Sequence, residues 1–545
     1  MSGLELPSFN LVDREWLPAR TLAGEPTTVS LLDVFTRAHE LRTLTGELAT
    51  QVFAVTRLLL AVVHRAVGGP RDVEQWEQLW HANTLPADKI AEYLRRHRDR
   101  FDLFDPEAPF FQVAGLRTAQ GETFALDRLI ADVPNGRPFF TSRAGGDLSL
   151  SFAEAARWLV HCHAFDPSGI KSGADGDKRV RGGRGYPIGV GWSGQLGGVL
   201  AQGATVRDTL LLNLLPYNPD SRDVPAWERP QLGPGTEPGR VPAGPLDLYT
   251  WQSRRVRLVA EQGRVRRVLV CNGDPLPPQN LHKLDPHTRW RRSQAQEKKH
   301  RKPLVYMPLQ HAPERVIWRG LQSMLPSAAV PGQGSEAAPR QRGELLEWLG
   351  ELSITGVLER THTLRLRTIG MVYGSNNSVT DEVVDDALGL HVELLRPDAT
   401  ALSGIAVGCV AAAEAAATAV GKLALTLAQA AGKVPPAKPG LPDPADVAER
   451  TRAIETAYAE LDQPFRTWLL GLDADTDPLA AQTDWHRTAA GIVRGLAEEV
   501  VARAPATGWT ARKVSGRVVT IAHAVEWFDR DLRAALPHAY TPAPA

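Results

Sequence analysis

The stretch that decides the fold of the C-terminal part is ALSGIAVGCVAAAEAAATAVGKLALTLAQAA, residues 401–431. Alanine and leucine dominate it, and these residues lose little side-chain freedom in a helix, so the stretch has little strand propensity. A proline-rich segment, KVPPAKPGLPDP at 433–444, follows and cannot continue a helix. The pattern predicts one long helix with a sharp end.

Three more helical segments follow, at roughly 445–471, 478–503 and 509–536. In the last of these, apolar residues recur at steps of three and four: Val514, Val518, Ile521, Val525, Phe528 and Leu532. Four amphipathic helices with short connections favour a four-helix bundle. We place the bundle at 399–545 and a connection at 381–398.

Residues 1–380 mix helical and strand-like patterns with many glycines and prolines. Glu47–Ala66 carries a helical apolar stripe, whereas Phe110–Val113, Val256–Val259 and Val268–Cys271 are typical of strands. The fold class we expect is therefore α+β, with a large mixed α/β N-terminal domain before the bundle.

The overall charge excludes a generic polycation. The 545 residues hold 62 Lys and Arg against 62 Asp and Glu, so any nucleic-acid contact must come from a local patch. Residues 381–545 hold 15 Lys and Arg against 22 Asp and Glu, so the C-terminal part is acidic and the rest is mildly basic.

The three cysteines lie far apart in sequence and form no disulfide framework or metal-binding pair. The N-terminus lacks the basic and apolar regions of a secretory signal, and charge interrupts the apolar stretch that starts at residue 401. We expect a cytoplasmic protein with no membrane span.

Common catalytic motifs are absent from the sequence, which has no HExxH, GxxxxGK[ST] or GxSxG. GVGWSG at 189–194 matches GxGxxG, but the strand and helix that a dinucleotide site needs do not flank it. We predict no metal and no other cofactor.

Two clusters could hold a metal, and each has a plainer interpretation. His161 and His163 lack a second ligand pair at a suitable spacing, so buried side chains are favoured. The acidic group Asp381, Glu382, Asp385 and Asp386 is interpreted as the first turn of a helix, where negative charge is favoured.

A glycine-rich tract at 169–198 is the first feature that suggests nucleic-acid binding. It holds eleven glycines, interleaved with Lys171, Lys178, Arg179, Arg181 and Arg184. Glycines let a backbone approach a ligand closely, and the basic side chains attract phosphate. The alternative is a flexible connector.

Two other segments stand out. RWRRSQAQEKKHRK at 289–302 has seven Lys and Arg against one Glu, a density that suits a phosphate backbone or a solvated surface. YGSNNS at 373–378 predicts a tight turn, whose Asn side chains could also contact bases.

Several short motifs resemble one protein family, and their order and spacing cover essentially the whole chain. They are FNLVDREWLP at 9–18, HRDRFDLFDP at 97–106, PFFQV at 109–113, GIKSG at 169–173, GGRGYP at 182–187, TLLLNLLP at 209–216 and YGSNNS at 373–378. The chain resembles CasA, the large subunit of the type I-E CRISPR surveillance complex Cascade.

This resemblance implies a non-catalytic subunit in antiviral defence. Such a subunit recognises the protospacer-adjacent motif in double-stranded target DNA, promotes duplex opening and R-loop formation, and recruits the CRISPR helicase-nuclease. It implies as partners the target DNA, the 5′ handle of the guide RNA, the other Cascade subunits and the helicase-nuclease. Protein would read a short motif, and base pairing would read the rest.

The resemblance also assigns roles to residues. A glycine loop that contacts the motif from the minor groove corresponds to Gly182, Gly183 and Gly185. An amide wedge beside the motif corresponds to Asn376, Asn377 and Ser378, where the family has a glutamine at the position of Asn377. Asn is one methylene shorter, so either Asn376 or Asn377 could form the tip.

Further assignments concern RNA and charge. Phe140 and the loop after it correspond to the segment near the guide-RNA handle. Lys283 corresponds to a lysine near the motif, and charge alone suggests a DNA-facing path through Arg289, Arg291, Arg292, Lys298 and Lys299. Two alternatives stay open: a metal- or nucleotide-dependent enzyme acting on nucleic acid, and a scaffold without DNA contact.

Overall fold

The computed structural model describes residues 7–133, 148–218, 220–326, 340–432, 444–514 and 516–541. These residues form two compact units. The first holds the described residues within Met1–Arg315, Pro331–Leu352 and Leu364–Ala387. The second holds those within Val316–Val330, Ser353–Thr363 and Leu388–Ala545. The predicted boundary at 380 and the predicted connection at 381–398 thus differ from this division, which adds two earlier segments to the second unit.

Within the described residues, the strands before the C-terminal helices form four small sheets, with the strand orders β2-β1-β3, β5-β4-β8-β7, β13-β12-β6 and β10-β9-β11. Their bounds are β1 Leu17–Thr21, β2 Pro26–Val29, β3 Leu41–Leu44, β4 Lys171–Ser172, β5 Arg184–Gly185, β6 Gly198–Gln202, β7 Arg254–Glu261, β8 Arg264–Asn272, β9 Trp290–Arg292, β10 Tyr306–Pro308, β11 Arg340–Gln341, β12 Thr363–Tyr373 and β13 Thr380–His391.

Helices alternate with these strands along the chain. They are α1 Leu31–Thr36, α2 Ala49–Val67, α3 Val73–His81, α4 Ala87–Arg96, α5 Phe152–Phe165, α6 Val206–Leu212, α7 Pro245–Tyr249, α8 Gln294–His300 and α9 Glu344–Ile354. The predicted helix at 47–66 is confirmed as α2, which packs against α4, α5, α6 and α7. The expected mixed α/β architecture is therefore present.

One strand prediction was wrong. Phe110–Val113 forms a turn in which Phe111 takes a φ of 53°, although the Val113 amide donates a hydrogen bond to the Val256 carbonyl at 3.0 Å. The apolar run is explained by burial, because these aromatic rings stack on each other and on Trp227. A short buried apolar run does not by itself distinguish a strand from a packed turn.

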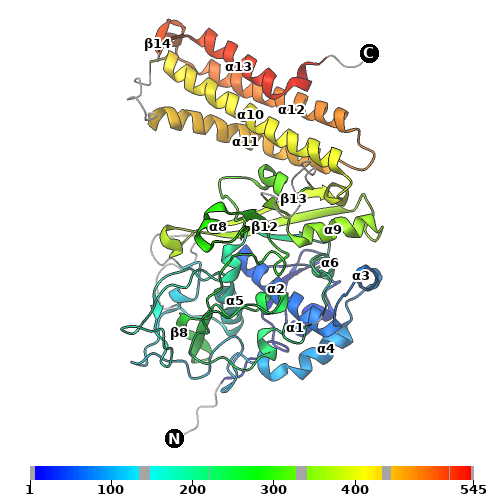
Figure 1. Cartoon of the computed structure of the whole chain (residues 1–545), viewed down its shortest axis with the longest axis vertical. Coiled ribbons are helices and arrows are strands. Elements are labelled where there is room, and N and C mark those ends of the chain that lie inside the picture. The colour runs from blue at the N-terminus through cyan, green and yellow to red at the C-terminus, as the bar shows by residue number, and fades with distance from the viewer. Residues whose placement is uncertain are drawn as a thin grey trace. The chain divides into compact units, whose positions relative to one another are not determined.

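The second unit contains four long helices, shown side by side from yellow to red in Figure 1. They are α10 Thr400–Ala430, α11 Pro444–Leu470, α12 Pro478–Ala502 and α13 Ile521–Ala535. Helix α10 contacts each of the other three, and α11 contacts α12. Trp318 stacks on Phe465 at 4.5 Å between ring centroids, and Phe465 meets the edge of Trp485 at 4.9 Å.

The last helix is shorter than its sequence pattern predicts. Strands β14 (Arg512–Val514) and β15 (Arg517–Val519) form a hairpin before α13 begins at Ile521. Val514 and Val518 match a helical spacing, but Gly516 takes a φ of 83°, which a helix cannot contain. Thr520 then caps α13 by accepting from the His523 amide.

Helices α2 and α10 are both long and apolar enough to cross a membrane by length and composition alone. Within the protein, 78% of the apolar window of α2 and 56% of that of α10 is buried. Buried core helices have the same composition, because their apolar faces pack against neighbouring elements.

Several histidines in the first unit are buried. Because burial disfavours the charged imidazolium, it lowers the pKa of His64 and His163 to about 4 and that of His161 and His287 to about 3. The plain interpretation of His161 and His163 is confirmed. His161 shares a hydrogen bond with the Thr50 hydroxyl at 2.9 Å, and His163 donates to the Phe111 carbonyl at 2.7 Å.

These histidines make stability depend on pH. Unfolded histidines bind protons below a pKa of about 6.5, whereas the folded ones stay neutral, so stability falls as pH drops from about 7 to 5.5. Each histidine contributes a loss of about 1 kcal/mol over this window. His311, whose pKa burial also lowers to about 3, adds a loss of the same size. Glu344 has the opposite effect on stability, because burial raises its pKa to about 7. Its carboxyl therefore takes up a proton in the folded state as the pH falls, which stabilises the fold. We expect a net loss of about 4 kcal/mol, measured as a lower thermal midpoint.

A pair of variants separates this effect from general acid sensitivity. His163→Gln can still donate to the Phe111 carbonyl and should reduce the pH-dependent loss by about 1 kcal/mol. The control is His81→Gln, which changes a side chain that is 66% exposed. This variant should leave the pH-dependent loss of stability unchanged. A midpoint that stays level or rises as the pH falls would contradict the assignment.

Candidate nucleic-acid interface

The predicted turn at 373–378 is confirmed as the tight connection between β12 and β13. The Gly374 amide donates to the Val379 carbonyl at 3.0 Å, and the Asn377 amide donates to the Gly374 carbonyl at 2.9 Å. Asn376 and Asn377 take φ values of 56° and 54°, which Asn tolerates better than most residues. Both side chains are exposed, as is Ser378. We call residues 374–379 the Asn turn.

The Asn turn is anchored to the segment that follows α5. The Ser168 amide donates to the Asn377 carbonyl at 2.7 Å, and the Tyr373 hydroxyl donates to the Phe165 carbonyl at 2.6 Å. The start of α5 is fixed in turn by a reciprocal cap between Ser151 and Glu154. Two hydrogen bonds therefore hold the Asn turn against the C-terminal end of α5 and the residues that follow it.

The predicted glycine loop forms a hairpin between β4 and β5, which we call the glycine hairpin. Arg181 and Arg184 exchange backbone hydrogen bonds of 3.0 and 3.1 Å, which leaves Gly182 and Gly183 as the two central residues of the turn. Their φ values are 56° and 74°. Two positive φ values in succession define a type I′ turn, which strongly favours glycine or asparagine.

The three predicted glycines have different environments. Gly182 and Gly183 are exposed, and a Cβ added at either would meet no atom within 4 Å. Gly185 is buried within β5, where an added Cβ would lie 3.0 Å from the Asn272 amide nitrogen. Only the first two present bare backbone to solvent, so Gly185 is a packing position.

Four later glycines of the tract serve packing, a role that their sequence pattern does not predict. Gly191, Gly194, Gly197 and Gly198 are buried, and an added Cβ at Gly194 would overlap the Tyr373 hydroxyl. GVGWSG at 189–194 leads into a short 3-10 turn rather than a long helix, so the context of a dinucleotide site is missing there.

A buried ion cluster lies between the start of the glycine hairpin and the segment that follows α5. The Asp166 carboxylate accepts from Lys171 Nζ at 2.6 Å and from Arg254 Nε at 2.5 Å. Arg254 also donates to the Pro167 and Gly189 carbonyls at 3.0 and 2.9 Å. Burial by itself would raise the pKa of Asp166, but the two cations bring that pKa below its ordinary value.

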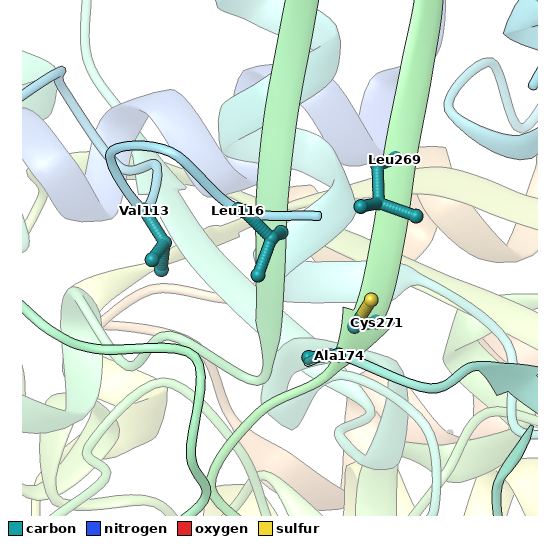
Figure 2. Close-up of a cluster of buried hydrophobic side chains, with 5 residues drawn as sticks. All are labelled: Val113, Leu116, Ala174, Leu269 and Cys271. Carbon is teal, nitrogen blue, oxygen red and sulfur yellow. The ribbon is translucent and has the colours of Figure 1, made fainter. Parts of the chain in front are cut away.

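An apolar cluster supports the sheet that carries the glycine hairpin. Figure 2 shows Leu269 and Cys271 of β8 near Ala174, which follows β4, and near the loop that carries Val113 and Leu116. Ser172 of β4 pairs with Cys271 of β8. The base of the hairpin is therefore fixed by packing, while its tip extends into solvent.

The structure brings the glycine hairpin and the Asn turn together. The Gly173 amide donates to the Gly183 carbonyl, and Gly173 lies five positions after Ser168, whose amide bonds Asn377. Because an extended chain spans at most about 3.6 Å per residue, the two tips lie within roughly 30 Å of each other. A cleft of about 790 Å³ is lined by both segments, including Lys171 and Ser375.

The predicted basic path divides into exposed and buried members. Lys283, Arg291, Lys298 and Lys299 are exposed. Arg292 is paired with Glu297 at 2.7 Å. Arg289 does not belong to this path, because its side chain is buried and only 5% exposed. Its guanidinium forms a hydrogen bond of 2.9 Å with the His311 ring, and burial lowers the pKa of Arg289 to about 10. Phe140 lies outside the described residues.

The interpretation of the acidic group as a helix start was wrong. Asp381, Glu382, Asp385 and Asp386 lie on strand β13, and Asp385 pairs with Arg367 of β12 at 2.7 Å. Alternation along a strand places successive carboxylates on opposite faces. Within the described residues, no group of three or more His, Cys, Asp or Glu is arranged to hold a metal ion.

Comparisons with solved structures identify the class of protein. The fold matches Cse1 of Thermobifida fusca with a TM-score of 0.87 and 43% identity, covering 98% of this chain and 99% of that one. It matches the CRISPR-associated protein Cse1 of Acidimicrobium ferrooxidans with a TM-score of 0.82 and 31% identity, covering 98% and 100%. A chain of a CRISPR RNA-guided surveillance complex shares the fold at 19% identity, with a TM-score of 0.62 over 91% of this chain and 99% of that one.

Sequence comparison gives the family. The CRISPR-associated protein Cse1 family matches residues 10–496. The CRISPR-associated protein CasA/Cse1 of Thermus thermophilus is 32% identical over 404 residues, which cover 72% of this chain and 73% of that protein. The chain belongs to the CasA/Cse1 family, so the family resemblance found in the sequence is confirmed.

The anchoring of the Asn turn can be tested with Tyr373→Phe. Loss of the hydroxyl leaves the Phe165 carbonyl without this donor, which costs about 1 kcal/mol and loosens the turn. We expect faster hydrogen exchange at the Ser168 and Asn377 amides, measured by mass spectrometry. Tyr186→Phe is the control, because Tyr186 is 56% exposed. Equal exchange in the two variants would show that the hydroxyl does not anchor the turn.

Proposed function

We propose that this chain is the large, non-catalytic subunit of a type I-E CRISPR surveillance complex. In this role it recognises the protospacer-adjacent motif in double-stranded target DNA, promotes duplex opening and R-loop formation, and recruits the CRISPR helicase-nuclease in antiviral defence. Family membership supports the assignment to the complex. The single observation that supports motif recognition is the close placement of the glycine hairpin and the Asn turn.

The glycine hairpin suits contact with the minor groove. That groove is about 6 Å wide, and a turn without side chains can enter it where a larger tip would be excluded. Gly182 and Gly183 offer backbone donors and acceptors there. Arg184 is exposed beside them and Arg181 folds back onto the Lys178 and Val180 carbonyls, so positive charge flanks the tip. Because minor-groove edges are degenerate, reading at this tip would be permissive.

The Asn turn suits the separation of the first base pair. Unstacking a base step costs a few kcal/mol, so the group that enters the stack must be held firmly. The bond from Ser168 and the buried Tyr373 hydroxyl supply this support. The two tips lie within roughly 30 Å, which is less than one turn of B-form DNA at about 34 Å. One duplex can therefore meet both hairpins.

The remaining partners follow from the proposed role. The 5′ handle of the guide RNA would be contacted near Phe140, and the exposed basic residues Lys283, Arg291, Lys298 and Lys299 would follow the DNA backbone. Other Cascade subunits and the helicase-nuclease would dock on further surfaces. The protein would act in the cytoplasm, away from membranes.

The competing hypothesis is a metal- or nucleotide-dependent enzyme acting on nucleic acid. Its best candidate residue, Asp385, forms a bidentate pair with Arg367 at 2.7 and 2.8 Å. Such a pair occupies the carboxylate oxygens that a metal would need. Metal-dependent cleavage of duplex DNA by this chain alone, abolished by Asp385→Ala, would favour the enzyme over our proposal.

Gly183→Asn tests the groove contact with little strain on the turn, because Asn tolerates positive φ and a Cβ added at 183 meets no atom within 4 Å. In the reconstituted complex, we expect at least a ten-fold loss of affinity for duplexes carrying a functional flanking motif. The measurement is binding across a library of flanking sequences. Gly263→Asn is the matched control, because Gly263 is exposed, has a φ of 73° and ends the β7–β8 hairpin turn. Equal affinities for the two variants would remove the glycine hairpin from the interface.

The wedge is tested with the double variant Asn376→Gly/Asn377→Gly, which removes both amides and keeps the positive φ values accessible. We expect motif binding within a few-fold of the native complex but at least ten-fold slower opening, followed by 2-aminopurine fluorescence beside the motif. The single variants decide which Asn is the tip. Gln262→Gly, at an exposed residue with a φ of 51°, is the control. Opening at the native rate would refute the wedge.

A further inference from the structure

A cavity in the first unit is lined by more cationic than anionic residues. It has a volume of about 30 Å³, and none of its lining residues belongs to the glycine hairpin or the Asn turn. Its charged lining residues are three arginines, Arg100, Arg229 and Arg240, and one acidic residue, Asp247. We call this space the arginine cavity.

One carboxylate serves two of these arginines. Asp247 accepts from Arg229 Nη2 at 3.0 Å and from Arg240 Nη2 at 2.6 Å. A neighbouring carboxylate, that of Asp274, lies 3.8 Å from Arg240 Nη1 but is bound more closely by Arg255, at 2.7 Å. These two carboxylates are therefore shared among three arginines before Arg100 is counted.

Arg100 is the arginine without an acidic partner. Its Nη1 donates to the Arg229 carbonyl at 2.8 Å, and its Nη2 donates to Gln231 Oε1 at 3.2 Å. Its Nε is buried and has no hydrogen-bond partner among the described residues. Burial lowers the pKa of Arg100, and the attraction of the more distant Asp105 does not offset this effect. The positive charge of Arg100 is thus poorly compensated.

Other acidic groups near the cavity do not supply the missing partner. Asp223 is occupied by the Leu246 and Asp247 amides, which it accepts at 3.2 and 2.9 Å, and burial raises its pKa. Burial also lowers the pKa of Arg229, although Asp247 contacts it. A buried cation without a matching anion is costly, so the cavity favours an additional negative charge.

The size and the walls of the cavity define the kind of anion. A volume of about 30 Å³ holds one or two bodies of the size of water, which excludes nucleotides and phosphate esters. Phe110, Phe111 and Trp227 also line the cavity, and the edges of aromatic rings carry partial positive charge. A water molecule could accept from Arg100 Nε but would leave the excess charge in place. A single-atom halide supplies both an acceptor and a charge.

We propose that the arginine cavity binds a chloride ion, with Arg100 Nε as a donor and Arg229 as a second cation. The ion stabilises the contact between the turn at 109–111 and the loop at 226–232, whose aromatic rings already stack on each other. This binding needs no nucleic acid and does not depend on the proposed function.

The test compares sodium chloride, sodium bromide and sodium gluconate with the full chain, at an equal ionic strength of about 0.15 M. Gluconate is too large for the cavity. We expect a thermal midpoint about 3 °C higher in chloride and in bromide, because an ion that binds only the folded state stabilises it. Arg100→Gln should abolish this difference. The matched control is Arg96→Gln, which should keep it, since Arg96 is 65% exposed and pairs with Glu92 on the surface of α4.

A second measurement needs no variant. Crystals of the native chain grown in bromide should show an anomalous peak within hydrogen-bond distance of Arg100 Nε. Absence of bromide from the cavity would overturn the proposal, as would equal native midpoints in chloride and gluconate, or an Arg100→Gln midpoint that responds to chloride as the native one does. A bromide peak without any effect on the midpoint would show binding at crystal concentration only, and would also overturn it.

Discussion

The candidate interface depends on one buried carboxylate. Asp166 sits directly after α5 and binds Lys171, which starts the glycine hairpin, and Arg254, which starts β7. The same short segment, 165–168, holds the Asn turn through two backbone groups. Removing one partner of a buried ion pair costs about 3–5 kcal/mol, because the other charge stays buried without compensation. Loss of this cluster would therefore loosen the short segment that supports both the glycine hairpin and the Asn turn.

Much of the fold followed from periodicity. The long helices α2, α10, α11 and α12 were predicted almost to their ends. Helix α2 shows an apolar repeat over many turns, and α10 has an alanine-rich composition with little strand propensity. Short elements were predicted less well. The hairpin before α13 shares its spacing of valines with a helix, and only the positive φ of Gly516 distinguishes the two. The acidic residues at the start of β13 were interpreted as the first turn of a helix. Asp385 pairs instead with Arg367 of β12, and this pairing cannot be recognised from the local sequence.

The candidate site was predicted in outline, from motifs rather than from geometry. Gly182, Gly183, Asn376 and Asn377 are local turn signals, and a turn can be recognised from its own residues. Ser168, Tyr373, Asp166 and Arg254 were missed, because a support is defined by partners that lie tens or hundreds of positions away in sequence. Arg289 shows the reverse error. Charge density placed it on a surface, but its neighbours bury it against His311.

The anchor of the Asn turn has a consequence for how such a protein can evolve. The bond between Ser168 and Asn377 joins two main-chain groups, so it does not depend on which side chain stands at 377. A substitution at 377 changes the length and chemistry of the side chain at the tip but leaves this backbone hydrogen bond in place. Single substitutions at 377 can therefore change the tip, provided that the new residue tolerates the positive φ of 54°.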